Sequence, residues 1–232
     1  MSDRKKSAPV RQPPSPSADQ TRAALVHAAL SLFGAKGFDG TSTREIAARA
    51  NANIGSIAYH FGGKEGLRTA VADYIVKTIG DIAGTALGKL QIGSGQQPDR
   101  QTAEAQLSNV LEAMMGFIVA RPEAGEIVQF VLRELSQPTT ALDRIYDGVF
   151  EPTHRRLCAI WEAATGDRAE SDETKLVIFT LIGQVVYFRI GREAVMRRMG
   201  WSDIGRSEAS QVVAVAKSNL DAILNARKGR TP

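Results

Sequence analysis

The apolar residues of this chain recur every three or four positions, and no sustained stretch alternates apolar with polar residues. A repeat of three to four residues places side chains on one face of a helix, whereas strict alternation is typical of a half-buried strand. Near the start, Leu25, Ala29, Leu32 and Phe33 show the helical spacing. Because this periodicity continues almost to the C-terminal end, the sequence predicts an all-α fold.

The expected helices are separated by short breaks that contain Gly, Pro, Asn or Asp. They cover approximately residues 21–37, 43–50, 54–61, 67–82, 102–120, 123–136, 140–165, 173–199 and 206–227. A stretch rich in Gln, Gly and Pro, residues 91–101, is expected to form a loop. Asp19 or Thr21 is expected to cap the first helix, and Ser42 or Thr43 the second, because their side-chain oxygens accept unpaired backbone amides.

The positive charge of the chain lies in its N-terminal part. Residues 1–19 carry four basic and two acidic side chains, residues 20–67 carry five and three, and residues 68–232 carry twenty of each. The formal net charge of +4 therefore belongs entirely to residues 1–67. This asymmetry predicts an N-terminal part that faces a polyanion, followed by an electrically neutral remainder.

The composition argues against several classes of site. Cys158 is the only cysteine, which rules out an intramolecular disulfide and argues against a cysteine metal site. His27, His60 and His154 share no ligand spacing, so we expect no metal and no other cofactor. No apolar stretch reaches the roughly 18 residues of a membrane helix. The Pro-rich residues 1–19 lack the apolar segment of a secretory signal. We expect a cytoplasmic protein with no membrane partner and with a disordered, basic tail over these first residues.

Residues 41–67, TSTREIAARANANIGSIAYHFGGKEGL, contain two short helices joined by a tight turn. Asn51 suits the turn because it tolerates a left-handed backbone, and Asn53 is placed to cap the second helix. This second helix exposes small residues, among them Gly55 and Ser56, which allow a close approach to the major groove of DNA. Inward-facing apolar residues fix the crossing of the two helices: Ile46, Ala50, Ile57 and Phe61. The segment is therefore expected to be a helix-turn-helix.

The same segment resembles the DNA-binding domain of TetR-family transcriptional regulators over residues 20–67. The matching residues run from the first helix to the start of the fourth: Phe33, Gly37, Phe38, Thr43, Ile46, Ala47, Gly55, Tyr59, His60, Phe61, Lys64, Glu65 and Leu67. The Tyr-His-Phe-x-x-Lys-Glu spacing is a hallmark of that family. The chain departs from the family at Asn51, where Gly is usual, and at Ile54, where a polar residue is more common.

The resemblance and the helix positions together predict which residues contact a double-stranded DNA operator: Thr43, Arg44, Asn53, Ile54, Gly55, Ser56, Tyr59, His60 and Lys64. Thr43, at a helix N-terminus, is placed to bind a phosphate, and Arg44 beside it reaches phosphate or base. By resemblance, Tyr59, His60 and Lys64 also hold phosphates. Residues at the start of the second helix are expected to read base edges.

Several C-terminal segments resemble the CecR-type subgroup of the same family. They are FVLREL over residues 130–135, Glu151-Pro152-x-His154, Trp161, LIGQVVYFRIGRE over residues 181–193, and Gly200-Trp201. The resemblance implies that residues 68–232 form a helical domain that pairs two subunits and encloses a small-molecule pocket. The expected helix over residues 173–199 is apolar on all sides, which independently indicates burial in a core or at a subunit interface.

Two sets of candidate residues follow for this domain. Together with the last helix, the apolar helix is expected to form a homodimer interface that contains Phe179, Leu181, Gly183, Val186, Val213, Leu220, Ile223 and Leu224. Polar residues inside apolar helices, with apolar walls, indicate a ligand pocket: Met114, Phe117, Phe130, Arg133, Glu134, His154, Trp161, Gln184, Tyr187 and Arg192. The alternative is that Arg133–Glu134 and Arg192–Glu193 form structural ion pairs across helices and that the aromatic residues are plain core.

These features predict a ligand-responsive transcriptional regulator, a repressor that binds a pseudo-palindromic operator as a homodimer and is released by a small-molecule effector. One alternative is the same DNA-binding fold without such an effector, regulated by a partner protein. A helical enzyme is the other alternative, but the sequence lacks a phosphate-binding Gly loop, a nucleophile elbow, a zinc motif and a Glu-x-x-His pair. We therefore expect no catalytic residues.

Overall fold

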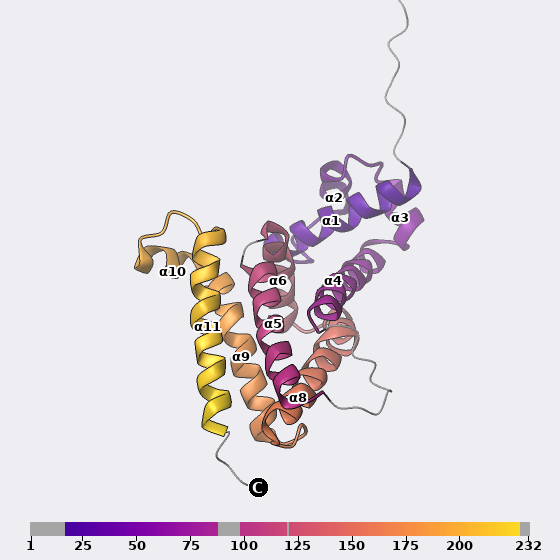
Figure 1. Cartoon of the computed structure of the whole chain (residues 1–232). Helices are drawn as coiled ribbons and strands as arrows, with labels where there is room; N and C mark the ends of the chain where they lie inside the picture. The colour runs from indigo at the N-terminus through magenta and orange to yellow at the C-terminus, as the bar shows by residue number, and fades with distance from the viewer. Residues whose placement is uncertain (1–16, 88–97, 120, 228–232) are drawn as a thin grey trace, which may run out of the picture.

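The computed structural model describes residues 17–87, 98–119 and 121–227, and every regular element within these ranges is helical (Figure 1). The predicted all-α fold is therefore confirmed. Residues 1–16 of the predicted tail and residues 91–97 of the predicted loop lie outside the described ranges.

The N-terminal bundle consists of α1 (Ala18–Lys36), α2 (Thr43–Arg49), α3 (Gly55–Phe61) and the long α4 (Lys64–Ala86). α1 begins earlier than predicted, because Ser17, and not Asp19 or Thr21, caps it. The Ser17 hydroxyl accepts the amide of Gln20, whose side chain in turn accepts the amide of Ser17. At the start of α2, the predicted cap by Ser42 is confirmed.

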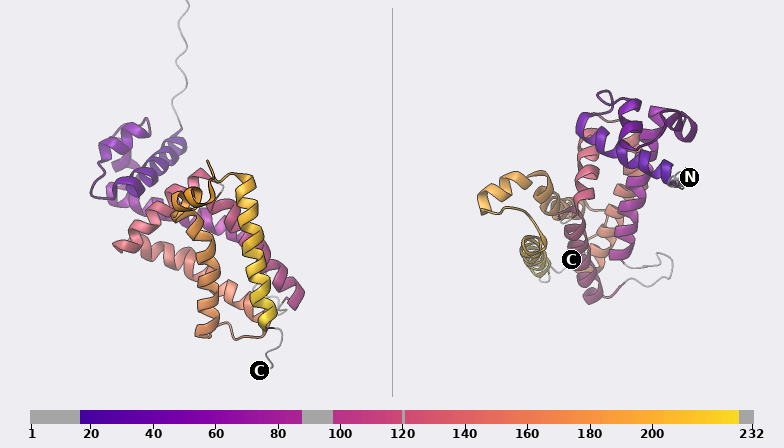
Figure 2. Two further views of the ribbon diagram at one scale, coloured as in Figure 1. Left: turned by 90° about the vertical axis from the view of Figure 1, so that its left-hand side faces the viewer. Right: turned by 90° about the horizontal axis from the view of Figure 1, so that it is seen from above.

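The C-terminal part consists of α5 (Arg100–Ile118), α6 (Pro122–Ser136), α7 (Thr140–Ile145), the π-helical turn η1 (Tyr146–Phe150), α8 (Glu151–Thr165), α9 (Asp172–Ile190), α10 (Arg192–Met199) and α11 (Arg206–Arg227). α9 and α11 run side by side along one side of the molecule, and α10 projects away from the body (Figure 2). α5 packs between α8 and this pair, so that it is the central helix of the C-terminal part.

Two of the predicted helices contain breaks. The prediction of one helix over residues 173–199 is wrong, because the chain bends by 76° between α9 and α10 at Gly191. The Tyr187 ring lies where a side chain at Gly191 would be, with the Cζ atom 3.0 Å from the place of a Cβ. The helix predicted over residues 140–165 widens into η1 between α7 and α8. Gly148 lies in this turn, and a Cβ at its position would be 2.9 Å from Cγ2 of Val76 in α4.

The hydrophobic core crosses the predicted domain boundary after residue 67. Phe33 and Ile57 of the N-terminal bundle belong to one buried cluster with Phe130 of α6 and Ile145 of α7. Gly34 allows α1 to lie directly against α6, since a Cβ at this position would be only 3.3 Å from the Phe130 amide nitrogen. The N-terminal bundle is thus packed onto α6. The domain boundary after residue 67 stays a prediction.

Candidate nucleic-acid interface

Bonds within the chain hold the two short helices of the N-terminal bundle at their angle. The buried Thr41 hydroxyl donates to the Gly37 carbonyl at 2.7 Å and closes the turn after α1. Ser42 and Glu45 form a reciprocal capping box at the start of α2. Asn51 has a φ of 50°, the left-handed conformation that the sequence predicts, and there the chain reverses toward α3. α2 and α3 therefore form the predicted helix-turn-helix.

The outer face of α3 is open to solvent, at the end of the molecule that carries α1 and α2 (Figure 1). Tyr59 is 84% exposed and Ile54 is 49% exposed, and the exposed Gly55 adds no side chain. On the inner face, Ile57 is 1% exposed and anchors α3 in the core. The N-cap of α3 is Ile54 and not the predicted Asn53, but the Asn53 side chain accepts a hydrogen bond of 2.8 Å from the Gly55 amide. The start of α3 is thus both small and rigidly held.

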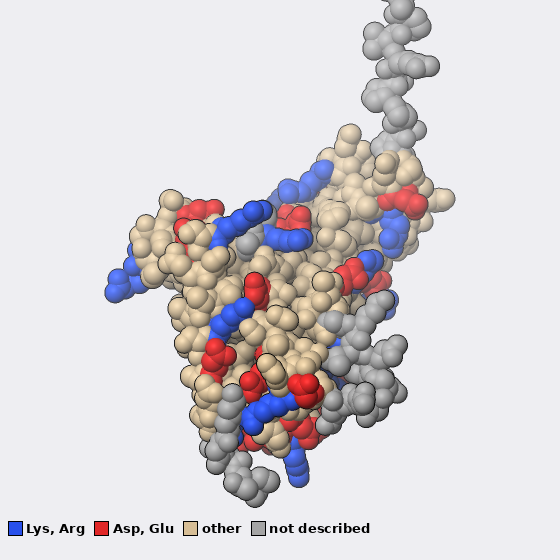
Figure 3. All heavy atoms as spheres, in the orientation of Figure 1, with Lys and Arg blue, Asp and Glu red and all other residues tan. Residues whose placement is uncertain are grey.

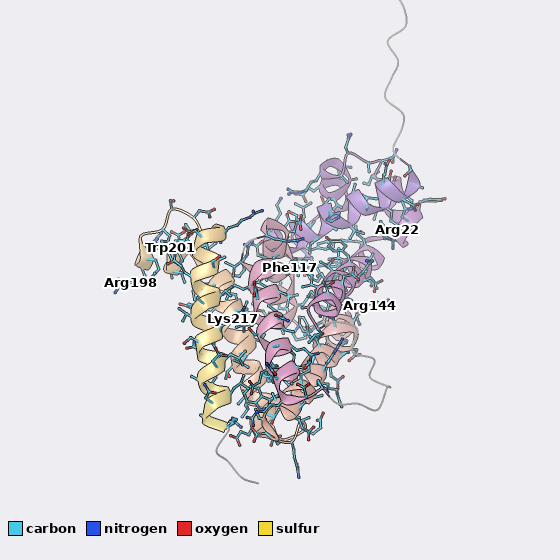
Figure 4. The ribbon with its side chains drawn as sticks, in the orientation of Figure 1. Arg22, Phe117, Arg144, Arg198, Trp201 and Lys217 are labelled. Carbon is cyan, nitrogen blue, oxygen red and sulfur yellow. The ribbon has the colours of Figure 1, made fainter. Side chains whose placement is uncertain are left out.

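Cations lie over two aromatic rings beside the helix-turn-helix. The Lys64 ammonium is 4.2 Å and the Arg68 guanidinium 4.1 Å from the centre of the Phe38 ring. The Arg22 guanidinium is 5.4 Å from the centre of the Phe61 ring, at the side of α1 near α3 (Figure 4). Lys64 is therefore folded back over the turn. Arg22 was not predicted, because its place beside α3 depends on how α1 crosses that helix and has no local sequence signal.

The remaining candidate residues lie along α2 and α3. Thr43 is the first residue of α2 and half-buried, and Arg44 beside it is exposed. The ring of His60 meets that of Tyr59 edge to face, with 4.9 Å between their centres. Ser56 is half-buried in the first turn of α3. The nine predicted contact residues thus belong to one motif and its two ends.

The positive charge of this motif is partly neutralised. The Lys36 ammonium lies 2.7 Å from the Glu45 carboxylate, and this bond, followed by those from Ser42, lowers the pKa of Glu45 to about 2. The carboxylate therefore stays ionised at ordinary pH and offsets Lys36. Arg44 and Arg49 are exposed and are the outward-facing cations of α2.

The residues predicted for a ligand pocket do not converge on one cavity. Phe130, Arg133 and Glu134 border a cavity of about 610 Å³ between α1, α4 and α6. Arg192 borders a separate cleft of about 990 Å³ between α5, α10 and α11. Apolar members of the predicted set lie in the hydrophobic clusters instead: Met114, Phe117 and Trp161. These two cavities thus contain only part of the predicted set, and a single pocket built from all of these residues stays a prediction.

Most polar residues of the predicted pocket make bonds that hold the fold. The pairs are Arg133 with the Gly34 and Ala35 carbonyls, Glu134 with the Thr139 hydroxyl, His154 with the Lys175 carbonyl, Gln184 with Asn219, and Arg192 with Asp203. Tyr187 is exposed on the outer side of α9. These bonds agree with the alternative of a structural role: Arg133 bonds carbonyls of α1 and Arg192 pairs with Asp203. Glu134 and Glu193 bond residues close to them in the sequence, Thr139 and Arg197.

The predicted interface set mixes inner and outer residues. Leu181, Leu220 and Leu224 are buried in the core of the single chain, and the half-buried Val213 borders the cleft. Their place in an interface stays a prediction. Gly183 is exposed, and Val186 and Ile223 are half-buried. The large apolar side chains that are more than half exposed on α9 and α11 are Leu176, Phe179, Tyr187, Ile190 and Val215. Only Phe179 among them was predicted for an interface.

Two further properties concern the described residues as a set. No group of three or more His, Cys, Asp or Glu side chains in this part of the chain is placed to hold a metal ion. None of its helices is by itself long and apolar enough to cross a membrane. α9 and α10 meet those length and composition criteria only as a pair, and that pair is sharply bent.

The geometry defines a class of protein, since a short exposed helix set on a capped turn against a supporting bundle is a helix-turn-helix of DNA-binding regulators. Residues 25–71 match the family described as bacterial regulatory proteins, tetR family. Residues 103–227 match the C-terminal domain of the HTH-type transcriptional dual regulator CecR. The chain belongs to the TetR family of transcriptional regulators and carries a C-terminal domain of the CecR type.

Individual relatives agree with this assignment. The chain is 30% identical over 216 residues to the HTH-type transcriptional dual regulator CecR of Shigella flexneri, which covers 92% of this chain and 95% of that protein. The fold is similar to that of a TetR-like regulator from Rhodococcus sp. RHA1, with a TM-score of 0.62 and 18% identity over 94% of this chain and 100% of the other. It is also similar to PfmR from Thermus thermophilus, with a TM-score of 0.58 and 17% identity over 88% and 95%. These relatives are transcriptional regulators, so the chain is a DNA-binding regulator and not an enzyme.

Proposed function

We propose that the protein is a repressor that binds a pseudo-palindromic operator as a homodimer and leaves it when a small molecule binds the C-terminal domain. The open outer face of α3 is the observation that carries this proposal. Ile54, Gly55 and Tyr59 are uncovered there, and a helix with so small a leading edge fits the major groove of DNA. Such a repressor would act in the cytoplasm, where bacterial operators lie.

The contacts divide into two kinds. Residues at the start of α3 read base edges, where the exposed Ile54 side chain offers apolar contact to a thymine methyl group. Tyr59, His60 and Thr43 hold phosphates with hydrogen bonds from their side chains, and Arg44 adds charge. Phosphate contacts set the register of the protein on the duplex, while base contacts select the sequence.

The outer faces of α9 and α11 support a homodimer. Leu176, Phe179, Gly183, Tyr187 and Ile190 follow one another at three- or four-residue spacing and form a single exposed stripe on α9. α11 runs beside this stripe and adds an exposed valine (Figure 2). A contiguous apolar surface of this kind marks a protein interface. A second copy that packs there around a two-fold axis would present two α3 helices to two half-sites.

α6 is the element that would carry the release signal. Arg133, near its C-terminal end, bonds the last turn of α1, and Gly34 brings the two helices into close contact. An effector that displaces α6 would therefore rotate α1. This rotation would change the distance between the two α3 helices of the dimer. The affinity for the operator then falls, and the largest possible decrease is set by the ratio of the effector's affinities for the displaced and the undisplaced state.

Footprinting on the promoter beside the protein's own gene, at two salt concentrations, tests this function. We expect protection of a pseudo-palindrome whose half-sites lie about one helical turn apart, with an affinity that falls as the salt concentration rises. Protection that ignores sequence, or no protection at all, would overturn the proposal. Release that requires a second protein would replace the small-molecule step by a partner-regulated one.

A further inference from the structure

The cleft of about 990 Å³ concentrates positive charge in a part of the chain whose net charge is zero. Residues 68–232 carry equal numbers of basic and acidic side chains, yet the border of the cleft has five cationic and two anionic ones. Both carboxylates are already paired, Glu112 with Lys217 at 2.6 Å and Asp203 with Arg192. Lys217 lies on the side of α11 that faces α5 (Figure 4). An excess of three positive charges therefore remains, and a cleft focuses the field of such charges on what enters it.

Three of the five cations come from three different helix ends. Arg121 precedes α6, Arg189 lies in the last turn of α9, and Arg206 is the first residue of α11. Neither Arg121 nor Arg206 has an ion-pair partner within the described residues. Lys and Arg side chains gather at the upper end of this face, where α6 and α11 begin (Figure 3). The fold thus brings together charges that lie far apart in the sequence.

Two of the arginines lie in an unfavourable environment. The Nη1 atom of Arg192 is buried and has no acceptor among the described residues. Burial, and then the nearby charge of Arg192, lower the pKa of Arg189. A buried donor without an acceptor and two adjacent like charges both destabilise the cleft as it stands. An oxyanion would remove both penalties, because it accepts hydrogen bonds and carries the opposite charge.

The opposite wall of the cleft is apolar. Val119 and Ile204, each only 2% exposed, line the cleft together with Ala209 and Val213 of α11. Val213 and the exposed Val215 are two residues apart, which places them about 200° apart around the helix. The cleft therefore lies on a different face of α11 from the surface assigned to the second copy.

We propose that this cleft binds an amphipathic organic anion, whose carboxylate or phosphate lies among Arg121, Arg192 and Arg206 and whose apolar part rests on Val119 and Val213. This inference rests on the proposed small-molecule release, and it names the chemical class of the effector. The class follows from the charge excess and the apolar wall, and the volume leaves room for a molecule of ordinary effector size.

The same cleft is in direct contact with α6. The Arg189 guanidinium lies against the backbone of this helix, since a Cβ on Gly125 would fall 1.7 Å from Nη2. α6 thus starts at the cleft, beside Arg121, and ends at Arg133, which bonds α1. An anion bound to Arg121 would therefore act at the start of the helix that holds the DNA-binding bundle.

Two fluorescent probes that differ by one charged group test this inference on the full-length protein. The probes are 1-anilinonaphthalene-8-sulfonate, which is anionic, and N-phenyl-1-naphthylamine, which has the same rings without the sulfonate. We expect the Arg121→Gln/Arg206→Gln double variant to weaken binding of the anionic probe by about tenfold, because two charge-assisted contacts are lost. Binding of the neutral probe should not change. Arg198→Gln, an exposed position on α10 outside the border, is the matched control and should alter neither.

Equal loss of both probes, equal loss in the control, or no loss in the double variant would overturn the inference. Displacement of the anionic probe by octanoate or by octyl phosphate, but not by octanol, supports it and identifies the charged group. Operator binding by the same samples without a probe separates the two proposals. If the probes give the expected result but the protein does not bind the operator, only the proposed function is refuted. If the protein binds the operator but the double variant binds the anionic probe as well as the wild type does, only the inference about the cleft is refuted.

Discussion

Arg133 joins the two halves of the molecule through the end of a helix. Its Nε donates to the Gly34 carbonyl at 2.5 Å and its Nη2 to the Ala35 carbonyl at 2.6 Å. Carbonyls in the last turn of a helix have no partner within the helix, and a cation there is favoured by the helix dipole. One side chain of α6 therefore both completes α1 and ties it to the C-terminal part.

Replacement of Arg133 by Gln should lower the free energy of unfolding by about 1–3 kcal/mol, because the carbonyl of the buried Gly34 loses a charged donor. Urea denaturation followed by circular dichroism measures this. Arg197→Gln is the control, since its ion pair with Glu193 is exposed and contributes at most about 0.5 kcal/mol. A loss no larger than that of the control would show that this contact does not join the two parts.

His60 and Ser56 should affect DNA binding differently. We expect His60→Ala to weaken binding to all operators alike by about 1 kcal/mol, because a phosphate contact carries no sequence information. Ser56→Ala should change the preferred bases, because its position is at the start of α3. Fluorescence anisotropy with an operator and its single-base variants measures both. If both substitutions act equally on every sequence, the division into phosphate and base contacts is wrong.

At the scale of elements, α9 shows what could be predicted and what could not. Ile178 and Leu181 of this helix face the core, while Leu176 and Tyr187 face outward. Helix positions, the Ser42 cap and the Asn51 turn were predictable, because each signal acts within a few residues. Which side of an all-apolar helix is the inner one depends on helices that are distant in the sequence, and periodicity does not contain that information.

The partners of polar side chains also depend on how distant segments pack, so periodicity does not predict them. Gln184 bonds Asn219 and Arg192 bonds Asp203, and each pair joins segments that meet only after the helices have packed. A polar residue in an apolar helix therefore indicates that a partner exists, but not whether the partner is a ligand or another side chain. The nine DNA-contact candidates stay a prediction, and the sequence could indicate them as a group because they come from one continuous motif.

The widened turn η1 lets α4 cross close to the α7–α8 segment. Gly148→Ala should destabilise the protein by about 1–3 kcal/mol, because the added Cβ would lie 2.9 Å from the stiff Val76 side chain. The added Val76→Ala substitution should recover part of this loss, and a double-mutant cycle in thermal or urea unfolding measures the coupling. Gly84→Ala in α4 is the control, since no atom lies within 4 Å of its Cβ position, and it should stabilise by about 0.4–1 kcal/mol. Purely additive effects would contradict the steric account.

At the scale of the whole molecule, the charge is divided by function. The positive excess of residues 1–67 lies in the part that carries the helix-turn-helix. The remainder has no net charge, but cationic side chains outnumber anionic ones at the border of its cleft. Because Glu45 offsets Lys36, exposed groups such as Arg44 carry the charge of the motif. Pairing of two copies would place two such motifs on one DNA and double the number of phosphate contacts.

Pairing through α9 and α11 can be tested by placing a carboxylate on their outer faces. Leu176→Glu and Val215→Glu change side chains that are 64% and 63% exposed, so the single chain should still fold. Burial of an unpaired carboxylate at an interface costs several kcal/mol, which should raise the dimer dissociation constant at least about 100-fold. Sedimentation measures the dissociation, and operator affinity should fall with it, since one α3 helix then binds alone. Leu135→Glu, a 55% exposed position on α6 away from the stripe, should leave the dimer intact. If all three variants dimerise like the wild type, the two copies pair through another face.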